Sequence, residues 1–272
     1  MIIVNVKLAT IFKYIYLVVI SFVSIFPFAW MIISATNSSK DVSMGKMTFG
    51  SEFMNNLAKL NETVDLRTVI GNSFKIAIIT TILALLFSSM AGYAFDIYKT
   101  RVTNLIFSIL LLAMMIPFVA IMVPLFRMMT LVGLLNNYIA VIIPGIATPF
   151  LIFFFRQSTQ SFPREMIEAA RIDGLNEFQI FLRVYIPIMK STYAAAAIIT
   201  FMGAWNNYLW PLVMLQTNDK KTLPLVISSL SSAYQPDFGM IMVGIIIATL
   251  PMVIVFFSMQ KYFVNGMLGS LK

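Results

Sequence analysis

The side chains best suited to ionic contacts are concentrated in one stretch, EAARIDGLNEFQIFLRVYIP, at residues 168–187. Only 11% of the whole chain is charged and 60% is hydrophobic, so this polar stretch stands out from its surroundings. Carboxylate and guanidinium groups form strong charge-assisted hydrogen bonds, which suits contact with a partner protein. The charged residues of the stretch are Glu168, Arg171, Asp173, Glu177 and Arg183.

A second polar group lies inside an apolar stretch, FMGAWNNYLWPLVML, at residues 201–215. The amides of Asn206 and Asn207 can hydrogen-bond the hydroxyls of a sugar, and the rings of Trp205 and Tyr208 can stack on its faces. The alternative is that the amides join one membrane helix to another, where a hydrogen bond contributes roughly 0.6–2 kcal/mol. On chemistry alone, the helix-joining role is favoured.

Several classes of chemistry are excluded because the chain contains no cysteine and no histidine. Disulfides, thiolate nucleophiles, imidazole bases and His- or Cys-ligated metals are impossible without these residues. We therefore predict no catalytic residue and no metal site, and a membrane enzyme is only a distant alternative. The net charge of +8 is attributed to lysine and arginine on the cytoplasmic side of a membrane, and no nucleic-acid partner is expected.

Long apolar runs predict an all-α, polytopic membrane protein. The chain has 272 residues and a mean hydropathy of +0.89, far above that of soluble domains. A helix needs about 20 apolar residues to cross the hydrocarbon layer of a bilayer. Six spans are predicted, at about 14–35, 70–95, 104–126, 138–155, 191–215 and 239–260.

The distribution of basic residues orients these spans. With both termini in the cytoplasm, 11 of the 19 lysine and arginine residues fall on the cytoplasmic side, as the positive-inside rule requires. The predicted division is a span with an extracytoplasmic loop at 1–69, and a core of five spans at 70–272. A cytoplasmic loop at 156–190 interrupts that core, and residues 260–272 form a tail.

Acidic residues and prolines indicate how such a bundle works. All 11 acidic residues are placed in loops, whereas ion-driven transporters usually need a polar site inside the membrane. Prolines in or at the ends of spans break backbone hydrogen bonds that lipid cannot replace, which favours kinked helices around a cavity. These are seven of the 11 prolines: Pro27, Pro117, Pro124, Pro144, Pro149, Pro211 and Pro251.

The cytoplasmic loop is predicted to be a helical hairpin. Its first helix begins near Pro163 and ends at Gly174, which can adopt the left-handed conformation. Asn176 is the expected N-cap of the second helix, and Pro187 is expected to end or kink that helix. The hairpin suits docking into a groove on a soluble partner, and the alternative is an amphipathic loop resting on the lipid surface. One apolar stripe of the second helix is expected at Phe178, Phe181, Leu182 and Tyr185.

The hairpin resembles the EAA motif of permease subunits of ABC importers. That motif has Glu-Ala-Ala, three residues, Gly, nine residues, and Ile-x-Leu-Pro; the last four residues here are Val-Tyr-Ile-Pro. The resemblance implies a type I ABC importer permease fold in which the loop supplies a coupling helix for a partner ATPase. The implied coupling residues are Glu168, Ala169, Ala170, Arg171, Asp173, Gly174 and Pro187.

A second resemblance concerns the solute. The segment WNNYLWPL is similar to one found in carbohydrate-uptake permeases, the class that includes the smaller membrane subunit of the maltose transporter. The similarity continues through TLPLVISSL at 222–230 and LPMVIVFFSMQKYFVNGM at 250–267, and covers about 70–272. In the maltose system the larger partner permease holds the sugar, so these residues are expected to line the pathway: Trp205, Asn206, Asn207 and Tyr208.

The resemblance also implies the remaining parts of the assembly. These are a homologous second permease, two ATP-binding cassette ATPases and an extracytoplasmic solute-binding protein, in a bacterial cytoplasmic membrane. ATP would be bound by the partner subunits, with no cofactor in this chain. The alternatives are an importer for glycerol-3-phosphate or a related polyol, an ion-coupled secondary transporter, and a membrane scaffold.

Overall fold

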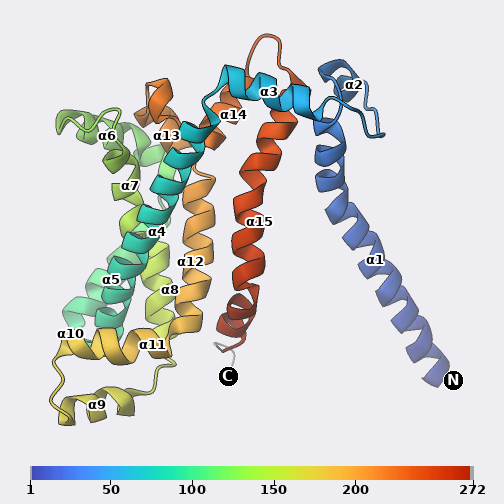
Figure 1. The fold of residues 1–272 in the computed structure, drawn as a ribbon. Coiled ribbons are helices and arrows are strands. Elements are labelled where there is room, and N and C mark those ends of the chain that lie inside the picture. The colour runs from blue at the N-terminus through green and yellow to red at the C-terminus, as the bar shows by residue number, and fades with distance from the viewer. Residues whose placement is uncertain (1, 270–272) are drawn as a thin grey trace. The chain divides into compact units, whose positions relative to one another are not determined.

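The structure is a computed structural model, and it describes residues 2–269. The described residues form helices, turns and loops with no strand, in agreement with the predicted all-α class. The chain divides into two compact units, which are described separately below (Figure 1). The first unit comprises residues 1–66 and 227–250, and the second comprises residues 67–226 and 251–272.

The first unit contains one long helix, α1 (Ile2–Ala35), two short helices, α2 (Ser39–Ser43) and α3 (Phe53–Thr63), and parts of α14 and α15. The side chain of Asn56 is buried and donates to the backbone carbonyls of Ala35 and Asn37, both at 2.9 Å. Gly239 of α15 lies so close that a Cβ there would be 2.6 Å from the Asn37 carbonyl oxygen. This glycine is therefore required by a close backbone approach.

The second unit holds most of the remaining helices. They are α4 (Leu66–Ile97), α5 (Arg101–Ala113), α6 (Phe118–Leu131), α7 (Tyr138–Ile146), α8 (Pro149–Thr159), α9 (Arg164–Ile172), α10 (Glu177–Ile180), α11 (Ile186–Ile188), α12 (Lys190–Trp205) and α13 (Leu209–Met214). A π-helical turn, η1 (Phe181–Tyr185), joins α10 to α11, and a 3₁₀ turn, η2 (Asn218–Lys220), precedes α14 (Leu223–Ser231). The boundary between the units falls within α14 and again within α15 (Phe238–Gly269).

Four helical stretches are long and apolar enough to cross a membrane: Thr10–Ala35, Leu66–Ile97, Tyr138–Thr159 and Phe238–Gln260. They confirm the first, second, fourth and sixth predicted spans as apolar helices. Helix α15 continues through most of the predicted tail, to Gly269.

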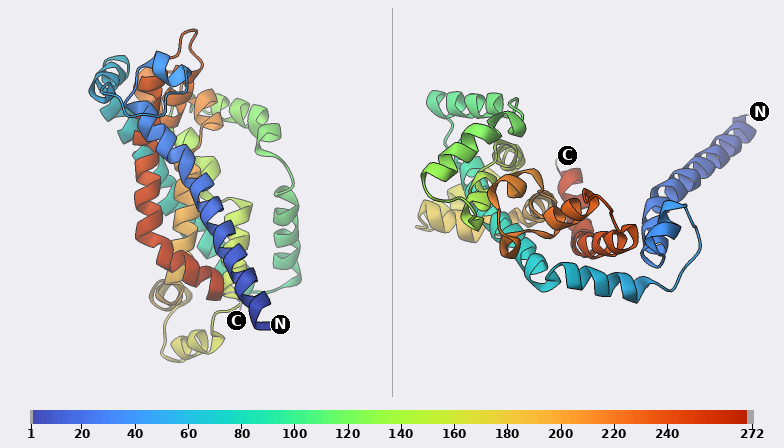
Figure 2. Two further views of the ribbon diagram at one scale, coloured as in Figure 1. Left: turned by 90° about the vertical axis from the view of Figure 1, so that its right-hand side faces the viewer. Right: turned by 90° about the horizontal axis from the view of Figure 1, so that it is seen from above.

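The third predicted span, at 104–126, is wrong as a single helix. It consists of α5 and α6, whose axes differ by 103° (Figure 2, left). Pro117, which lacks an N–H group, precedes the first residue of α6 and has an extended conformation. Residues before a proline avoid the helical region, so α5 ends at Ala113 and a short turn follows.

The fifth predicted span, at 191–215, also differs. Its helix α12 starts at Lys190 but ends at Trp205, and residues after Tyr208 form the separate short helix α13. The helix Glu177–Ile188 precedes α12 at an angle of 82°. In Figure 1, α10 and α11 run across the end of α8 and α12, and α9 lies beyond them.

Candidate functional site

Helix α9 contains the central part of the charged stretch, and its ends follow from local sequence. Pro163 occupies the N-cap position, and Glu165 lies in the first turn, where a carboxylate interacts favourably with the helix dipole. At the other end the N–H of Leu175 donates to the carbonyl of Ala170 at 3.0 Å. Gly174 lies between them with a φ of +81°, so the helix ends in a Schellman motif that favours glycine. The predicted role of Gly174 in ending the helix is confirmed.

The two faces of α9 differ in exposure. Ile167 and Ala170 are buried against the second helix of the hairpin. On the outward side Ile172 is 87% exposed and Met166 is 46% exposed, which is a large apolar surface for a charged nine-residue helix. Of the predicted coupling residues, only Ala170 is buried. The exposed ones are Glu168, Ala169, Arg171, Asp173, Gly174 and, in α11, Pro187.

The second helix of the hairpin begins as predicted. The Asn176 side chain accepts from the N–H of Gln179, and the Gln179 side chain accepts from the N–H of Asn176, which forms a capping box. Pro187 does not end this segment, because the bend into α12 comes later, at Met189.

The predicted apolar stripe on this segment is partly wrong. Phe181 and Tyr185 are buried, but Phe178 is 60% exposed and Leu182 is 41% exposed. The π-helical turn at residues 181–185 is wider than an α-helical turn and shifts the buried face. Ile180 and Met189 complete the buried face instead.

Asp96 forms a buried charge cluster that sequence reasoning missed. It was expected in a loop, yet it lies in the last turn of α4 with its side chain fully buried. One carboxylate oxygen is 2.8 Å from Nη2 of Arg164 and the other is 2.7 Å from Nζ of Lys99. Two cations thus compensate one buried carboxylate, as a stable buried charge requires.

A second polar cluster joins the two helices of the hairpin. Glu177 accepts from Nε of Arg171 at 2.8 Å and from the hydroxyl of Tyr98. The hydrogen bond from Arg171 is the main cause that lowers the pKa of the Glu177 carboxyl, and the bond from Tyr98 adds to it. Burial, followed by the bond to Glu177, raises the pKa of the Tyr98 hydroxyl.

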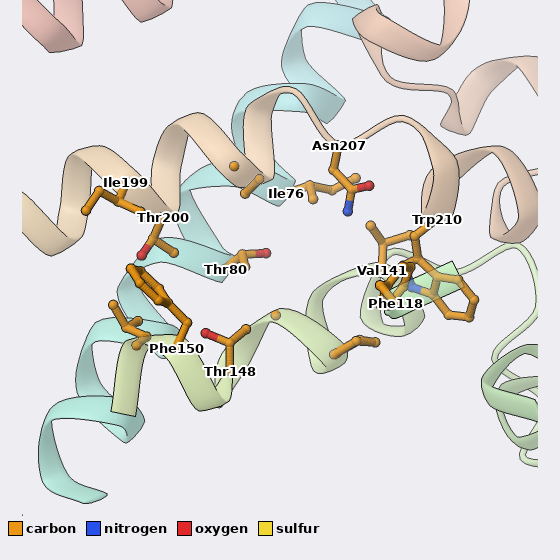
Figure 3. Close-up of a pocket in the computed structure, with 15 residues that line it drawn as sticks. Ile76, Thr80, Phe118, Val141, Thr148, Phe150, Ile199, Thr200, Asn207 and Trp210 are labelled. Carbon is orange, nitrogen blue, oxygen red and sulfur yellow. The ribbon is translucent and has the colours of Figure 1, made fainter. Parts of the chain in front are cut away.

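A cavity of about 380 Å³ lies within the second unit, between α4, α7, α8, α12 and the start of α13 (Figure 3). Its walls are mainly apolar. Of the described residues that line it, none carries a charge. The polar groups come from four side chains: Thr80, Thr148, Thr200 and Asn207.

Thr80 carries an unused hydrogen-bonding group in this cavity. Thr80 is 6% exposed, and its hydroxyl oxygen has no hydrogen-bond partner within residues 2–269. Its methyl group faces Gly145, where an added Cβ would lie 2.7 Å away. A buried hydroxyl without a partner is costly, and a hydrogen bond to a solute or water in the cavity would offset that cost.

Trp210 closes one end of the cavity through a specific backbone contact. Its indole N–H donates to the carbonyl of Ala140 at 2.8 Å. In a continuous α-helix that carbonyl would accept from the amide of residue 144, but Pro144 has none. The tryptophan therefore supplies the donor that the proline removes and attaches α13 to α7.

The four residues expected to line the pathway occupy different positions. Asn207 lines the cavity and directs its amide into it (Figure 3). Trp205 is buried beside Phe74 and Phe201, with ring centroids 4.7 and 5.9 Å away. Asn206 donates to the sulfur of Met252. Tyr208 is half-buried and is not among the lining residues.

Broken apolar helices around an uncharged cavity, with a charged helical hairpin beside them, are the features of a membrane permease. The chain belongs to the family of binding-protein-dependent transport system inner membrane components, whose model matches residues 84–269. The resemblance to ABC importer permeases is thereby confirmed.

Individual relatives agree with this assignment. The chain is 50% identical to the lactose transport system permease protein of Rhizobium radiobacter over 266 residues, which covers 98% of this chain and 97% of the relative. It is 37% identical to the arabinooligosaccharides transport system permease protein of Halalkalibacterium halodurans, with 93% of each chain covered. The sn-glycerol-3-phosphate transport system permease protein of Pectobacterium atrosepticum is 29% identical, with 96% and 97% covered.

A solved structure supports the fold. A chain of a bacterial ABC transporter involved in the import of the acidic polysaccharide alginate superposes with a TM-score of 0.84. The sequence identity is 23%, and the match covers 94% of this chain and 97% of the other. The chain therefore has the fold of an ABC importer permease.

Proposed function

We propose that this chain is a membrane-spanning subunit of an ATP-driven ABC importer for a neutral sugar or oligosaccharide. The observation that carries the proposal is the uncharged cavity, whose polar groups are three hydroxyls and one amide. Such groups donate and accept hydrogen bonds with hydroxyl-rich solutes without requiring a counter-charge. The 50% identity to a lactose transport permease supports a sugar as the solute.

Glycerol-3-phosphate is the alternative solute, and the cavity disfavours it. Burying a phosphate needs cationic partners or several aligned backbone donors. The described lining of this chain has no lysine or arginine. The glycerol-3-phosphate permease is also the more distant relative, at 29% identity against 50%.

The topology of the proposal has six spans with both termini in the cytoplasm of a bacterial cell. The third span is broken at the turn between α5 and α6, and the fifth is broken between α12 and α13. We assign Glu177–Ile188, which is bent by 82° from α12, to the cytoplasmic loop at 156–190. The division into a first region at 1–69 and a permease core at 70–272 is part of this proposal. Exposed apolar side chains along residues 11–28 of α1 suit contact with lipid.

We assign to α9 the coupling of ATP hydrolysis in the partner subunits to solute transport. Its outward face combines the apolar side chains of Met166 and Ile172 with the charges of Glu168 and Arg171, which suits a cleft on a cytoplasmic ATPase. Two such ATPases bind and hydrolyse ATP, and a homologous permease completes the pathway. An extracytoplasmic binding protein delivers the solute. ATP binding closes the ATPases, α9 and its counterpart move together, and the bundle opens outward.

The assembly is tested by gentle solubilisation of the native membrane, affinity purification of this chain and identification of the proteins that accompany it. We expect an ATPase, a second permease and a binding protein that carries a neutral saccharide. Recovery of the chain alone, with or without nucleotide, would contradict the proposal.

The coupling role of α9 is tested by Glu168→Lys and Gly174→Val. Both are expected to abolish uptake while leaving membrane insertion intact, because the first reverses a charge on the docking face and the second strains the helix end. Gly133→Val is the matched control, since Gly133 has a similar φ of +73° and equally open surroundings outside the hairpin. Normal uptake by both hairpin variants would refute the assignment.

A further inference from the structure

Side chains connect α9 to a helix that is distant in the sequence. Asp96, at the end of α4, and Arg164, at the start of α9, are separated by 68 residues and form a 2.8 Å ion pair. The Asp96 side chain is fully buried and that of Arg164 is half exposed, so water screens this contact less than it screens a pair with both partners exposed. Lys99 Nζ lies 2.7 Å from the second carboxylate oxygen and adds a second ion pair to the same carboxylate.

The far end of α9 has a comparable connection. Arg171, in its last turn, donates to Glu177, and Glu177 also accepts from Tyr98, which follows α4. Each end of α9 is therefore tied to the same end of α4 by polar groups. We call these two contacts the α4–α9 ties.

An aromatic layer lies between the ties. Tyr93 of α4 packs edge-on against Phe181 and Tyr185 of the π-helical turn, with ring centroids 5.5 and 4.8 Å apart. Ile167 and Ala170 of α9 belong to the same buried cluster. Close packing of this kind resists deformation, so the ties hold an already rigid unit.

The covalent connections of α9 are less direct. Toward α12, the chain passes through η1 and then an 82° bend, and both can absorb movement. Helix α4 continues without a break from Asp96 to Thr80 in the cavity, a length of about 24 Å at 1.5 Å per residue.

We propose that α9 and the cytoplasmic end of α4 move as one rigid piece, and that Asp96 and Tyr98 are the positioning residues that make this possible. When an ATPase displaces α9, α4 then moves with it and shifts Thr80 at the cavity. This adds to the movement that the covalent connection transmits to α12. The inference rests on the proposed function, in which α9 is the coupling helix.

The test compares transport with ATP hydrolysis in the complete importer reconstituted in liposomes with its binding protein. Asp96→Asn and Tyr98→Phe, singly and together, cut the ties with little change in shape. We expect ATP hydrolysis to persist and the amount of solute moved per ATP to fall by at least about fivefold in the double variant. Asp41→Asn is the matched control, because it breaks an exposed ion pair with Lys46 and is expected to change nothing.

A distance measurement separates coupling from a merely structural role. The chain has no cysteine, so spin labels can be placed at Met90→Cys on α4 and at Glu165→Cys on α9; both residues are exposed, and Glu165 is not assigned to the docking face. In the otherwise native importer the distance between the labels should stay constant between nucleotide-free and ATP-bound states. In the double variant it should change.

The outcomes are distinct. An unchanged ratio of solute to ATP and an unchanged label distance in the double variant would overturn the inference. If the double variant does not assemble, the same two measurements are made on Tyr98→Phe alone. This variant removes only one oxygen atom from a partly exposed side chain, so it should assemble. Absence of ATP-dependent uptake in the native importer would refute the proposed function instead.

Discussion

Replacement of Trp210 by phenylalanine removes the hydrogen bond that compensates for Pro144. The indole N–H donates at 2.8 Å to the Ala140 carbonyl, and Trp210 is 1% exposed, so water does not readily take its place. Leaving a buried acceptor without a partner costs about 1–3 kcal/mol. Interhelical hydrogen bonds in membranes contribute about 0.6 kcal/mol on average and at most about 1.7. The lost hydrogen bond and the smaller ring volume together should make Trp210→Phe destabilise the fold by about 2–3 kcal/mol.

A double-mutant cycle with Pro144→Ala isolates the hydrogen bond from the loss of ring volume. An alanine at position 144 restores the amide that a continuous helix directs at Ala140, so the indole donor becomes dispensable. Trp210→Phe should therefore cost about 1 kcal/mol less in the Pro144→Ala background than in the native one.

The assay is equilibrium unfolding of the purified chain in mixed micelles, followed by circular dichroism so that loss of a tryptophan does not affect the signal. Each of the four variants gives a free energy of unfolding, and the difference between the two Trp210→Phe costs is the coupling energy. Equal costs in both backgrounds would refute the view that Trp210 replaces the amide missing at Pro144.

The remaining predictions concern the cavity, a helix crossing and the hairpin. Thr80→Val removes an unpartnered hydroxyl at nearly constant side-chain shape. The melting temperature should therefore stay equal or rise, while sugar uptake falls. A fall in both the melting temperature and the uptake would contradict the role given to the cavity. Gly92→Ala places a Cβ 2.6 Å from a side-chain carbon of α8 and should lower the free energy of unfolding by about 1–3 kcal/mol. At Gly71, in the same helix, an added Cβ meets no atom within 4 Å, so Gly71→Ala should raise the free energy of unfolding by about 0.5–1 kcal/mol. Equal effects of the two alanines on the unfolding free energy would show that α4 and α8 do not cross as closely as described. The lowered pKa of Glu177 means that its bond to Arg171 adds stability above the ordinary pKa of 4.5, and this stability is lost as the pH falls through the lower folded value. The protection factors of the hairpin amides, which compare their hydrogen exchange with the intrinsic rate at the same pH, should accordingly fall below pH 4.5, and a similar fall in Glu177→Gln would assign the effect to another group.

Local features of the hairpin could be predicted from sequence. Asn176 caps the second helix and Gly174 adopts the left-handed conformation because both effects depend on neighbouring backbone atoms alone. The same holds for the long apolar helices, whose composition requires burial or lipid.

Other features depend on contacts that a local pattern does not contain. The π-helical turn moves the buried face from Phe178 and Leu182 to Ile180 and Met189, and a stripe counted at α-helical spacing cannot reveal this shift. The proline at 117 indicated a kink, but a bend of 103° is set by what packs on either side.

The buried charge and the cavity were the least predictable. Asp96 lies beside basic residues in the sequence and was placed in a loop, because its burial depends on Arg164, 68 residues later. Thr80 lies in a helix where hydroxyls commonly bond the preceding turn, and only the assembled helices direct it into a cavity. Asn207 alone among the cavity's polar side chains was singled out from sequence, through its aromatic neighbours.

Solute uptake by liposomes containing the complete importer, loaded with ATP and supplied with the binding protein outside, is the most direct test of the account. We predict ATP-dependent accumulation of a neutral saccharide, no accumulation of glycerol-3-phosphate, and loss of uptake in Glu168→Lys with membrane insertion intact. Accumulation driven by an ion gradient without ATP, or preferred uptake of the phosphorylated solute, would contradict it.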